Sequence, residues 1–277
     1  MSGTVRAACL QMTSGDDLDA NIAEAADLAR QAVEQGATFL ALPENAGFLE
    51  SRTERLAGLL KPDEETPMFA AMSALAREHG VAVLVGSTGV KLADDARAAN
   101  RSVLFGPDGA RLATYDKIHM FDVDLPGGES YRESARYRPG GQAVVADLAW
   151  GRLGLSICYD LRFPHLYRML AHAGAQVLTI PSAFTVPTGE AHWHVLLRAR
   201  AIETGCFVVA PAQTGTHPNG RRTYGHSLIV APWGDVLADA GTEPGVIVAD
   251  LDLARVAEAR TRVPALTHDR VIAAPKD

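Results

Sequence analysis

Cys158 is the residue of this 277-residue chain whose setting most clearly suggests chemistry. It follows a stretch, residues 151–157, in which apolar residues alternate with small or polar ones, as in a buried strand. Leu166, Leu170 and Ala173 then recur at helical spacing. The thiol is therefore predicted to lie on a sharp strand-to-helix turn, where free N–H groups and the helix dipole favour the thiolate. The same N–H groups would hold an oxyanion once the sulfur has attacked a carbonyl.

A cysteine at the end of an apolar strand is most often packed in a core, so the nucleophile hypothesis depends on its partners. Glu44 follows the strand-like run 38–42, and Lys117 follows the run 111–115. A partly buried carboxylate with a raised pKa can take the thiol proton, and an ammonium stabilises thiolate and oxyanion. Glu133, in the next loop, either orients the lysine and the substrate or is a surface loop residue, and the sequence leaves both alternatives open. Together these groups predict cleavage of an amide-type carbon–nitrogen bond through a thioester.

Strand-like and helix-like runs alternate along the chain, which predicts an α/β protein. The strand-like runs are residues 4–11, 38–42, 81–86, 101–106, 152–158, 176–181, 206–211, 226–231 and 246–251. The helix-like runs are residues 17–35, 66–79, 161–173 and 190–204.

Two segments of the first half recur in the second half. Residues 36–43 (Gly-Ala-Thr-Phe-Leu-Ala-Leu-Pro) are echoed by residues 174–181 (Gly-Ala-Gln-Val-Leu-Thr-Ile-Pro), and residues 101–109 by residues 226–234. Both matches include turn residues, which two unrelated α/β units would not share. We therefore expect two similar halves whose sheets pack face to face in a four-layer α-β-β-α sandwich.

The sandwich is expected to form a single domain, residues 1–277, because no linker of low complexity divides it. Residues 117–141, with Pro126-Gly127-Gly128 near the middle, form a long connection between the halves, and loops of that length tend to be functional. The tail, residues 260–277, carries charged residues without a helical or strand pattern, so we expect it to contact another subunit.

Composition narrows the classes of function. Hydrophobic residues make up 47% of the chain and charged residues 21%, as in an ordinary globular protein. A net charge of −7 without a run of Lys or Arg argues against a nucleic-acid partner. Three distant cysteines favour a reducing compartment over a disulfide framework. With no membrane-spanning run and no signal peptide expected before the first strand, we predict a cytoplasmic protein without a membrane partner.

Other hydrolytic chemistries fit the sequence less well. A metal hydrolase would have to use His192 and His194, the only close histidine pair, but positions i and i+2 of a helix point to different faces. No metal or cofactor is therefore expected. A cysteine–histidine hydrolase needs a histidine held by an acid, and no histidine has that context.

Three segments resemble the signature segments of the nitrilase, or carbon-nitrogen hydrolase, superfamily: residues 42–45 (Leu-Pro-Glu-Asn), 115–122 (Tyr-Asp-Lys-Ile-His-Met-Phe-Asp) and 157–164 (Ile-Cys-Tyr-Asp-Leu-Arg-Phe-Pro). They occur in the family's order, and the resemblance runs from residue 4 to about residue 255. It implies a catalytic triad of Glu44, Lys117 and Cys158. It also implies that Glu133 is an accessory glutamate, that the fold is the α-β-β-α sandwich, and that the chain forms dimers or higher assemblies.

Later segments resemble the Nit branch of that superfamily: residues 181–185, 189–193, 196–204, 212–215 and 222–227. The resemblance favours a deaminated glutathione amidase, with release of ammonia from a terminal amide. The alternatives are an ω-amidase acting on α-ketoglutaramate and another aliphatic amidase or N-carbamoyl hydrolase. His165 and His194 depart from the family pattern, which usually has an acid at these two positions.

A deaminated glutathione substrate carries two carboxylates and an α-keto group, so its pocket must present cations or N–H groups. Arg162 is the expected bidentate partner of a carboxylate. It could instead pair with Asp160 or Glu190 and only shape the turn. The remaining candidates for substrate binding are Tyr159, Thr185 and Tyr224.

Two functions of other classes stay open on the same fold. An N-acyltransferase would use the same three residues and pass the acyl group from the thioester to an amine. A non-catalytic interaction protein would be expected to lack at least one residue of the triad, and none is missing.

Overall fold

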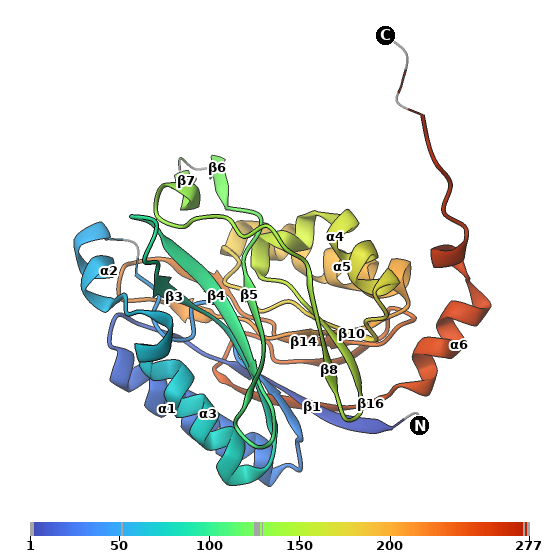
Figure 1. Ribbon diagram of the computed structural model, residues 1–277, viewed down its shortest axis with the longest axis horizontal. Coiled ribbons are helices and arrows are strands. Elements are labelled where there is room, and N and C mark those ends of the chain that lie inside the picture. Colours follow the sequence, from blue (N-terminus) through green and yellow to red (C-terminus); the bar gives the residue numbers. More distant parts are fainter. Residues whose placement is uncertain (1–2, 51, 125–127, 129, 274, 276–277) are drawn as a thin grey trace.

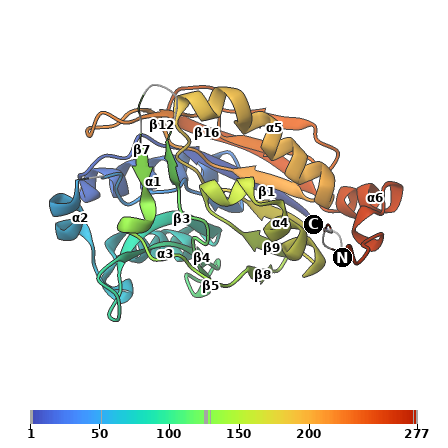
Figure 2. The ribbon, with the colours of Figure 1, turned by 90° about the horizontal axis from the view of Figure 1, so that it is seen from above.

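Two six-stranded sheets form the centre of the protein, and helices cover the outer face of each (Figures 1 and 2). The computed structural model describes residues 3–50, 52–124, 128, 130–273 and 275. One apolar cluster fills the space between the sheets and continues between the second sheet and its helices, and a second cluster lies between the first sheet and its helices. These layers confirm the predicted α-β-β-α sandwich.

The first sheet has the order β16 (Gly245–Asp252), β1 (Thr4–Gln11), β2 (Phe39–Ala41), β3 (Ala82–Lys91), β4 (Ala98–Phe105), β5 (Arg111–Asp116). The second has the order β8 (Val144–Leu148), β9 (Gly151–Leu155), β10 (Val177–Thr179), β11 (Phe207–Ala210), β14 (Leu228–Val230), β15 (Val236–Asp239). In each sheet the second to fourth strands are parallel and the others run antiparallel to their neighbours. The two halves therefore share one topology, as the internal echo predicts.

Strand periodicity explains how the layers are filled. In β1, Ala7 and Cys9 face the cluster between the sheets, whereas Ala8 and Leu10 face the helices. The turn before β2 is the counterpart of the turn before β10, and a glycine in the left-handed region closes each, with φ of 80° at Gly36 and 91° at Gly174.

Helices cover the outer faces in pairs. Helices α1 (Leu18–Glu34) and α3 (Pro67–His79) lie on the first sheet, and α4 (Pro164–His172) and α5 (Val186–Thr204) lie on the second (Figure 1). None of the helices in the described part of the chain combines the length and apolarity needed to cross a membrane.

The segment around Cys158 differs from the predicted strand 152–158. Strand β9 ends at Leu155, and residues Cys158–Arg162 form a 3-10 helix before α4 begins at Pro164. Proline is favoured in the first turn of a helix because it lacks an N–H group and has a fixed φ, so α4 starts three residues later than predicted. The same preference explains the early start of α5, which has Pro187 in its first turn.

Several elements were not predicted from the sequence. Most of them are too short to show a period. They are α2 (Thr53–Leu59), α6 (Ala254–Arg262), β8, β15, the hairpin of β6 (Asp122–Asp124) with β7 (Ser130–Arg132), and the hairpin of β12 (Thr214–Thr216) with β13 (Arg222–Tyr224). Helix α6 is as long as α4 but buries only Val256 and Ala259, so its apolar pattern is weak. The first hairpin belongs to the connection 117–141, in which Pro126 and Gly127 lie outside the described residues.

The tail differs from the expectation in its first residues. Residues 260–262 are the last turn of α6, and the Arg260 guanidinium donates hydrogen bonds to the carbonyl oxygen of Ala175 (2.7 Å) and to Cys206 Sγ (3.1 Å). Arg260 is therefore used inside the chain. Asp269 accepts a hydrogen bond from Arg168 Nε at 2.9 Å and lies 2.7 Å from His172 Nε2, both on α4, so it also contacts the body of the same chain. Residues 270–273 extend away from the body (Figure 1), and a subunit contact there stays a prediction.

Gly86 in β3 supports a prediction about stability. A Cβ at this position would lie 2.0 Å from the carbonyl oxygen of Leu42, 2.5 Å from that of Pro43 and 2.5 Å from Pro181 Cβ. Backbone atoms cannot move aside without shifting the turns after β2 and β10. We expect Gly86→Ala to lower the free energy of unfolding by about 3 kcal/mol in chemical denaturation.

The matched control for Gly86→Ala is Gly58→Ala in α2, where an added Cβ meets nothing within 4 Å. Alanine is a better helix former than glycine, so this control should be as stable as the parent protein or slightly more stable. Equal stability of Gly86→Ala and the parent would contradict the close approach of β3 to the two turns.

Candidate active site

Three chain segments that follow different strands meet at one rim of the sandwich. Glu44 follows β2, Lys117 follows β5 and Cys158 follows β9. The Lys117 ammonium lies 2.8 Å from Glu44 Oε1 and 2.8 and 2.9 Å from the two oxygens of Glu133. Lys117 is only 2% exposed, Glu44 3% and Cys158 7%. The structure thus brings together all four residues that the sequence nominated for catalysis.

Two carboxylates compensate for the burial of the Lys117 ammonium. Burial alone would lower the pKa of Lys117, but the charges of Glu133 and Glu44 outweigh it and raise that pKa well above its usual value. Glu133 is itself held by the backbone N–H of Phe121, which donates to Glu133 Oε2 at 2.6 Å. The lysine is therefore a fixed cation at the floor of the site.

Glu44 is held by donors from both halves of the sandwich. Asn100 Nδ2 donates to Oε1 at 3.1 Å, and the backbone N–H of Ala183 donates to Oε2 at 3.0 Å. Burial alone would raise the pKa of Glu44, but the Lys117 charge and the hydrogen bonds from Cys158 and Lys117 bring it below its usual value. The raised pKa expected from burial is therefore wrong, because the ammonium has the larger effect.

Cys158 lies in a strained backbone conformation, with φ of 50°, which L-residues rarely adopt. Its N–H donates to the carbonyl oxygen of Pro181 at 2.9 Å, so it is not free for an oxyanion. Burial and the adjacent Glu44 carboxylate raise the pKa of the thiol. The expected preference for thiolate is therefore wrong, and the sulfur needs a base when it reacts.

The sequence analysis missed two residues that hold the site together. Asn100 is 2% exposed and donates to both Glu44 and Glu133 (3.1 and 3.2 Å), so it fixes the two carboxylates relative to each other. Its only signal in the sequence is a polar side chain inside an apolar strand.

Asp160 is the second missed residue, and it joins two of the signature segments. Its carboxylate accepts hydrogen bonds from the Tyr115 hydroxyl (2.6 Å), the backbone N–H of His119 (3.0 Å) and the backbone N–H of Ile157 (2.9 Å). The segments that carry Lys117 and Cys158 are thereby fixed to each other. Its position in the first turn of the 3-10 helix was the available signal.

A cavity of about 490 Å³ opens above these groups. Its lining includes the four candidate catalytic residues together with two of the predicted substrate-binding residues, Tyr159 and Thr185. It also includes four arginines that the sequence analysis did not nominate: Arg132, Arg136, Arg221 and Arg222.

The other two predicted substrate-binding residues, Arg162 and Tyr224, do not belong to this lining. Arg162 Nη2 lies 3.2 Å from His192 Nδ1, and its guanidinium stands over the Phe184 ring at 5.8 Å. The suggested pairing of Arg162 with Asp160 is not formed, because the Asp160 carboxylate is engaged elsewhere.

Tyr224 packs against the first turn of α5 and is not part of the cavity lining. Its ring packs on Gly189 and stacks on His226 with a centroid distance of 4.5 Å.

Arg221 is placed to meet an anion inside the cavity. One terminal nitrogen donates to the carbonyl oxygen of Ala183, and the guanidinium stands over the Tyr131 ring at 5.4 Å. Within the described part of the chain, Arg221 Nε is buried without a hydrogen-bond partner. A buried donor of this kind is costly unless a ligand or water accepts its hydrogen bond.

Comparison with known proteins identifies the family. The family model for carbon-nitrogen hydrolases matches residues 6–261. A Synechocystis protein named deaminated glutathione amidase is 46% identical over 265 residues, which cover 95% of this chain and 97% of that protein.

Two solved structures are also similar. The Caenorhabditis elegans NitFhit protein superposes with a TM-score of 0.90 at 38% identity, over 97% of this chain and 66% of that one. A glutamate-to-glutamine variant of an amidase from Nesterenkonia sp. AN1 has a TM-score of 0.81 at 28% identity, over 96% of this chain and 94% of that one. That structure shows the acetamide moiety of fluoroacetamide added covalently at its active site cysteine.

The match to the family model covers most of the chain, and the similarity to the cyanobacterial protein extends over nearly the full length of both. The solved structures share the four-layer sandwich. The chain therefore belongs to the carbon-nitrogen hydrolase family, in the nitrilase superfamily, and is an amide-hydrolysing enzyme.

Proposed function

We propose that this protein hydrolyses deaminated glutathione through a thioester on Cys158. The observation that carries the proposal is the buried arrangement of Cys158, Glu44 and Lys117 at the floor of one cavity. It supplies a nucleophile, a base hydrogen-bonded to that nucleophile, and a fixed cation.

In the first half-reaction, Cys158 Sγ bonds to the amide carbonyl carbon while its proton passes to the Glu44 carboxylate. The pKa values of the thiol and of Glu44 keep the proton on sulfur until the carbonyl is in place. Negative charge then develops on the carbonyl oxygen, where the Lys117 ammonium stabilises it. Because the Cys158 N–H is engaged by Pro181, the next donor along the turn is the N–H of Tyr159.

The first half-reaction ends when the tetrahedral intermediate breaks its carbon–nitrogen bond. The proton on Glu44 passes to the leaving nitrogen, so an amine departs and a thioester remains. In the second half-reaction, water attacks the thioester and Glu44 takes one of the water protons. The acid product leaves as that proton returns to Cys158 Sγ. Glu133 holds Lys117 in place throughout and so acts as a positioning residue.

Two relatives support this scheme. The Nesterenkonia amidase variant carries its acetamide adduct at the active site cysteine. The Synechocystis relative is named for deaminated glutathione and matches this chain almost from end to end. We extend the nucleophile of the first and the substrate of the second to this chain.

The chemistry of this substrate changes one expectation from the sequence. In deaminated glutathione a keto group replaces the α-amino group of the glutamyl residue, so the remaining γ-amide joins α-ketoglutarate to cysteinylglycine. Its hydrolysis releases cysteinylglycine instead of ammonia. Release of ammonia from a terminal amide applies to α-ketoglutaramate, the substrate of the alternative ω-amidase.

The cavity offers the cations that such a substrate needs, although not from Arg162. We assign the role of carboxylate partner to Arg221, whose Nε is buried and unsatisfied in the described structure and whose charge also acts on Glu44. The additional arginines of the lining suit a substrate with two carboxylates better than α-ketoglutaramate, which has one.

The proposed roles of Glu44 and Lys117 predict how the activity depends on pH. Glu44 works as a base only when ionised, and Lys117 stabilises an oxyanion only when protonated. The pKa of Glu44 is held below the usual 4.5, and that of Lys117 above the usual 10.5. We therefore expect kcat/KM for a substrate that does not itself titrate to stay constant from about pH 5 to about pH 9. An acid limb centred near pH 6.5 would show that another group is the base.

The second prediction concerns the covalent intermediate. We expect the parent protein, quenched with acid during turnover, to carry an α-ketoglutaryl adduct at Cys158, whereas Glu44→Gln should form none, because it lacks the group that takes the thiol proton and then protonates the leaving nitrogen. Intact-protein and peptide mass spectrometry after incubation with deaminated glutathione would locate the adduct. Cys158→Ala should form no adduct and have no activity, whereas Cys206→Ala, which removes another buried thiol, should behave as the parent. Activity in Cys158→Ala would rule out the mechanism.

The third prediction concerns the substrate. We expect kcat/KM to be highest for deaminated glutathione, measured as cysteinylglycine, and lower for α-ketoglutaramate and propionamide, measured as ammonia. A preference for α-ketoglutaramate would assign the ω-amidase function. Product appearing only as an N-acyl compound when an amine is added would assign acyl transfer.

A pair of arginine variants tests the carboxylate partner. Arg221→Gln should lower kcat/KM for deaminated glutathione by about 10- to 100-fold and leave kcat/KM for propionamide nearly unchanged. Only deaminated glutathione has a carboxylate that would lose its contact with Arg221. Arg162→Gln, which lies outside the cavity, serves as the matched control and should have little effect. The reverse result would restore the role first expected of Arg162.

A further inference from the structure

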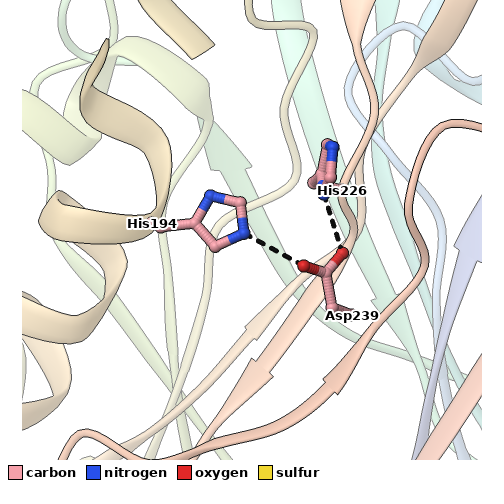
Figure 3. A group of neighbouring side chains, drawn as sticks. All are labelled: His194, His226 and Asp239. Atoms are coloured by element: carbon pink, nitrogen blue, oxygen red, sulfur yellow. Dashed lines mark hydrogen bonds and ion pairs between the residues drawn. The ribbon is translucent and has the colours of Figure 1, made fainter. Parts of the chain in front are cut away.

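Three side chains that could bind a metal converge outside the active site (Figure 3). His194 comes from α5, His226 from the loop between β13 and β14, and Asp239 from the end of β15. His194 Nε2 lies 3.0 Å from Asp239 Oδ2, and His226 Nδ1 lies 2.9 Å from Asp239 Oδ1. The potential ligand atoms of all three lie within 4.8 Å of one another.

The backbone around this cluster is built to hold His226 in place. His226 has a φ of 54°, in the left-handed region that L-residues rarely adopt. Its N–H donates to the carbonyl oxygen of Gly241 (2.6 Å), and its own carbonyl oxygen accepts from Trp193 Nε1 (2.7 Å). Stacking on Tyr224 orients the imidazole ring. Strain of this kind persists only where surrounding contacts over-determine the conformation.

Asp239 is fixed in the same way, because its Oδ1 accepts a hydrogen bond from the N–H of Gly241 at 2.9 Å. A second acid, Glu190, lies one helical turn before His194 on the same face of α5, and its charge, like that of Asp239, acts on Tyr224. The surroundings of the two histidines are therefore negatively charged, which favours a cation over an anion.

We propose that His194, His226 and Asp239 form a binding site for a divalent transition-metal ion, for which Zn²⁺ is the best match. Two imidazole nitrogens and one carboxylate oxygen are a ligand set that Zn²⁺ accepts, usually with water in the fourth position. The three side chains are 34%, 24% and 33% exposed, so water can reach that position. Each imidazole nitrogen lies 2.9 to 3.0 Å from an oxygen of Asp239. Small side-chain rotations would therefore be enough for the three groups to bind one ion.

The site is separate from the catalytic centre, because none of the three residues lines the cavity above Cys158. A bound ion would join α5 to the loop before β14 and to β15, and so would fix this helix, which begins directly after the cavity residue Thr185, to its sheet. The expected consequence is higher thermal stability of the metal-loaded protein.

The sequence pointed only to His192 and His194, which are close along the chain. In the structure, His192 Nδ1 lies 3.2 Å from Arg162 Nη2, and His192 is not part of the cluster. His194 instead meets partners that lie 32 and 45 residues further along the chain, and only the packing of α5 on the second sheet brings them together.

The test is Zn²⁺ binding to the purified full-length protein after treatment with a chelator, measured by competition with a chromophoric chelator. We expect one equivalent to bind to the parent protein. His194→Gln and Asp239→Asn should each weaken binding by about 100-fold or more, because the loss of even a residue that only supports a ligand costs 10- to 100-fold. Zn²⁺ should raise the midpoint of thermal unfolding of the parent and not of these variants.

Two controls separate this site from others. His192→Gln changes a histidine on the same helix outside the cluster and should bind as the parent does. Cys158→Ala removes the active-site thiol and should also retain binding. Equal affinity in the parent and in His194→Gln, or loss of binding only in Cys158→Ala, would overturn the proposal. In that case the three side chains form only a hydrogen-bonded His–Asp–His network.

Discussion

A lysine ammonium buried between two carboxylates is the interaction on which the rest of the active site depends. Removing Lys117 from water would be prohibitive without compensation, and both Glu44 and Glu133 supply it within 2.9 Å. The pairing has a second consequence. It lowers the pKa of Glu44 while the Glu44 charge and burial raise that of Cys158, so the enzyme keeps a neutral thiol beside an ionised base. In the proposed mechanism, the proton therefore leaves the thiol only as the sulfur bonds to the carbonyl carbon.

That arrangement requires both halves of the sandwich. Glu44 belongs to the first half, yet one of its oxygens is held by the N–H of Ala183 and its carbonyl oxygen by Gln213 Nε2, both from the second half. Cys158 belongs to the second half, and in the proposed mechanism it passes its proton to Glu44 of the first. Because equivalent strand ends of two similar sheets meet at one rim, a duplicated topology has produced a site that neither half contains alone.

The arginines that line the cavity come from two short hairpins and the residues beside them. Arg132 ends β7 and Arg136 follows it, whereas Arg221 precedes β13 and Arg222 begins it. Glu44, Lys117 and Cys158 instead follow strands of the two large sheets. In the proposed function, chemistry and substrate recognition therefore depend on different parts of the fold. The same division applies to the cluster of His194, His226 and Asp239, which uses the outer side of the second sheet and leaves the catalytic rim untouched.

Sequence alone was sufficient for the α/β class, for the two similar halves and for the nomination of Glu44, Lys117 and Cys158, because these follow from local periodicity and from short contiguous motifs. It was insufficient wherever a property arises from distant groups. The pKa of Glu44 is lowered and that of Cys158 is raised, in part by charges that other segments of the chain bring close. The proposal of Arg221 instead of Arg162 as the carboxylate partner depends on which side chains line the cavity. Neighbours in space decide both, and only tertiary packing determines those neighbours.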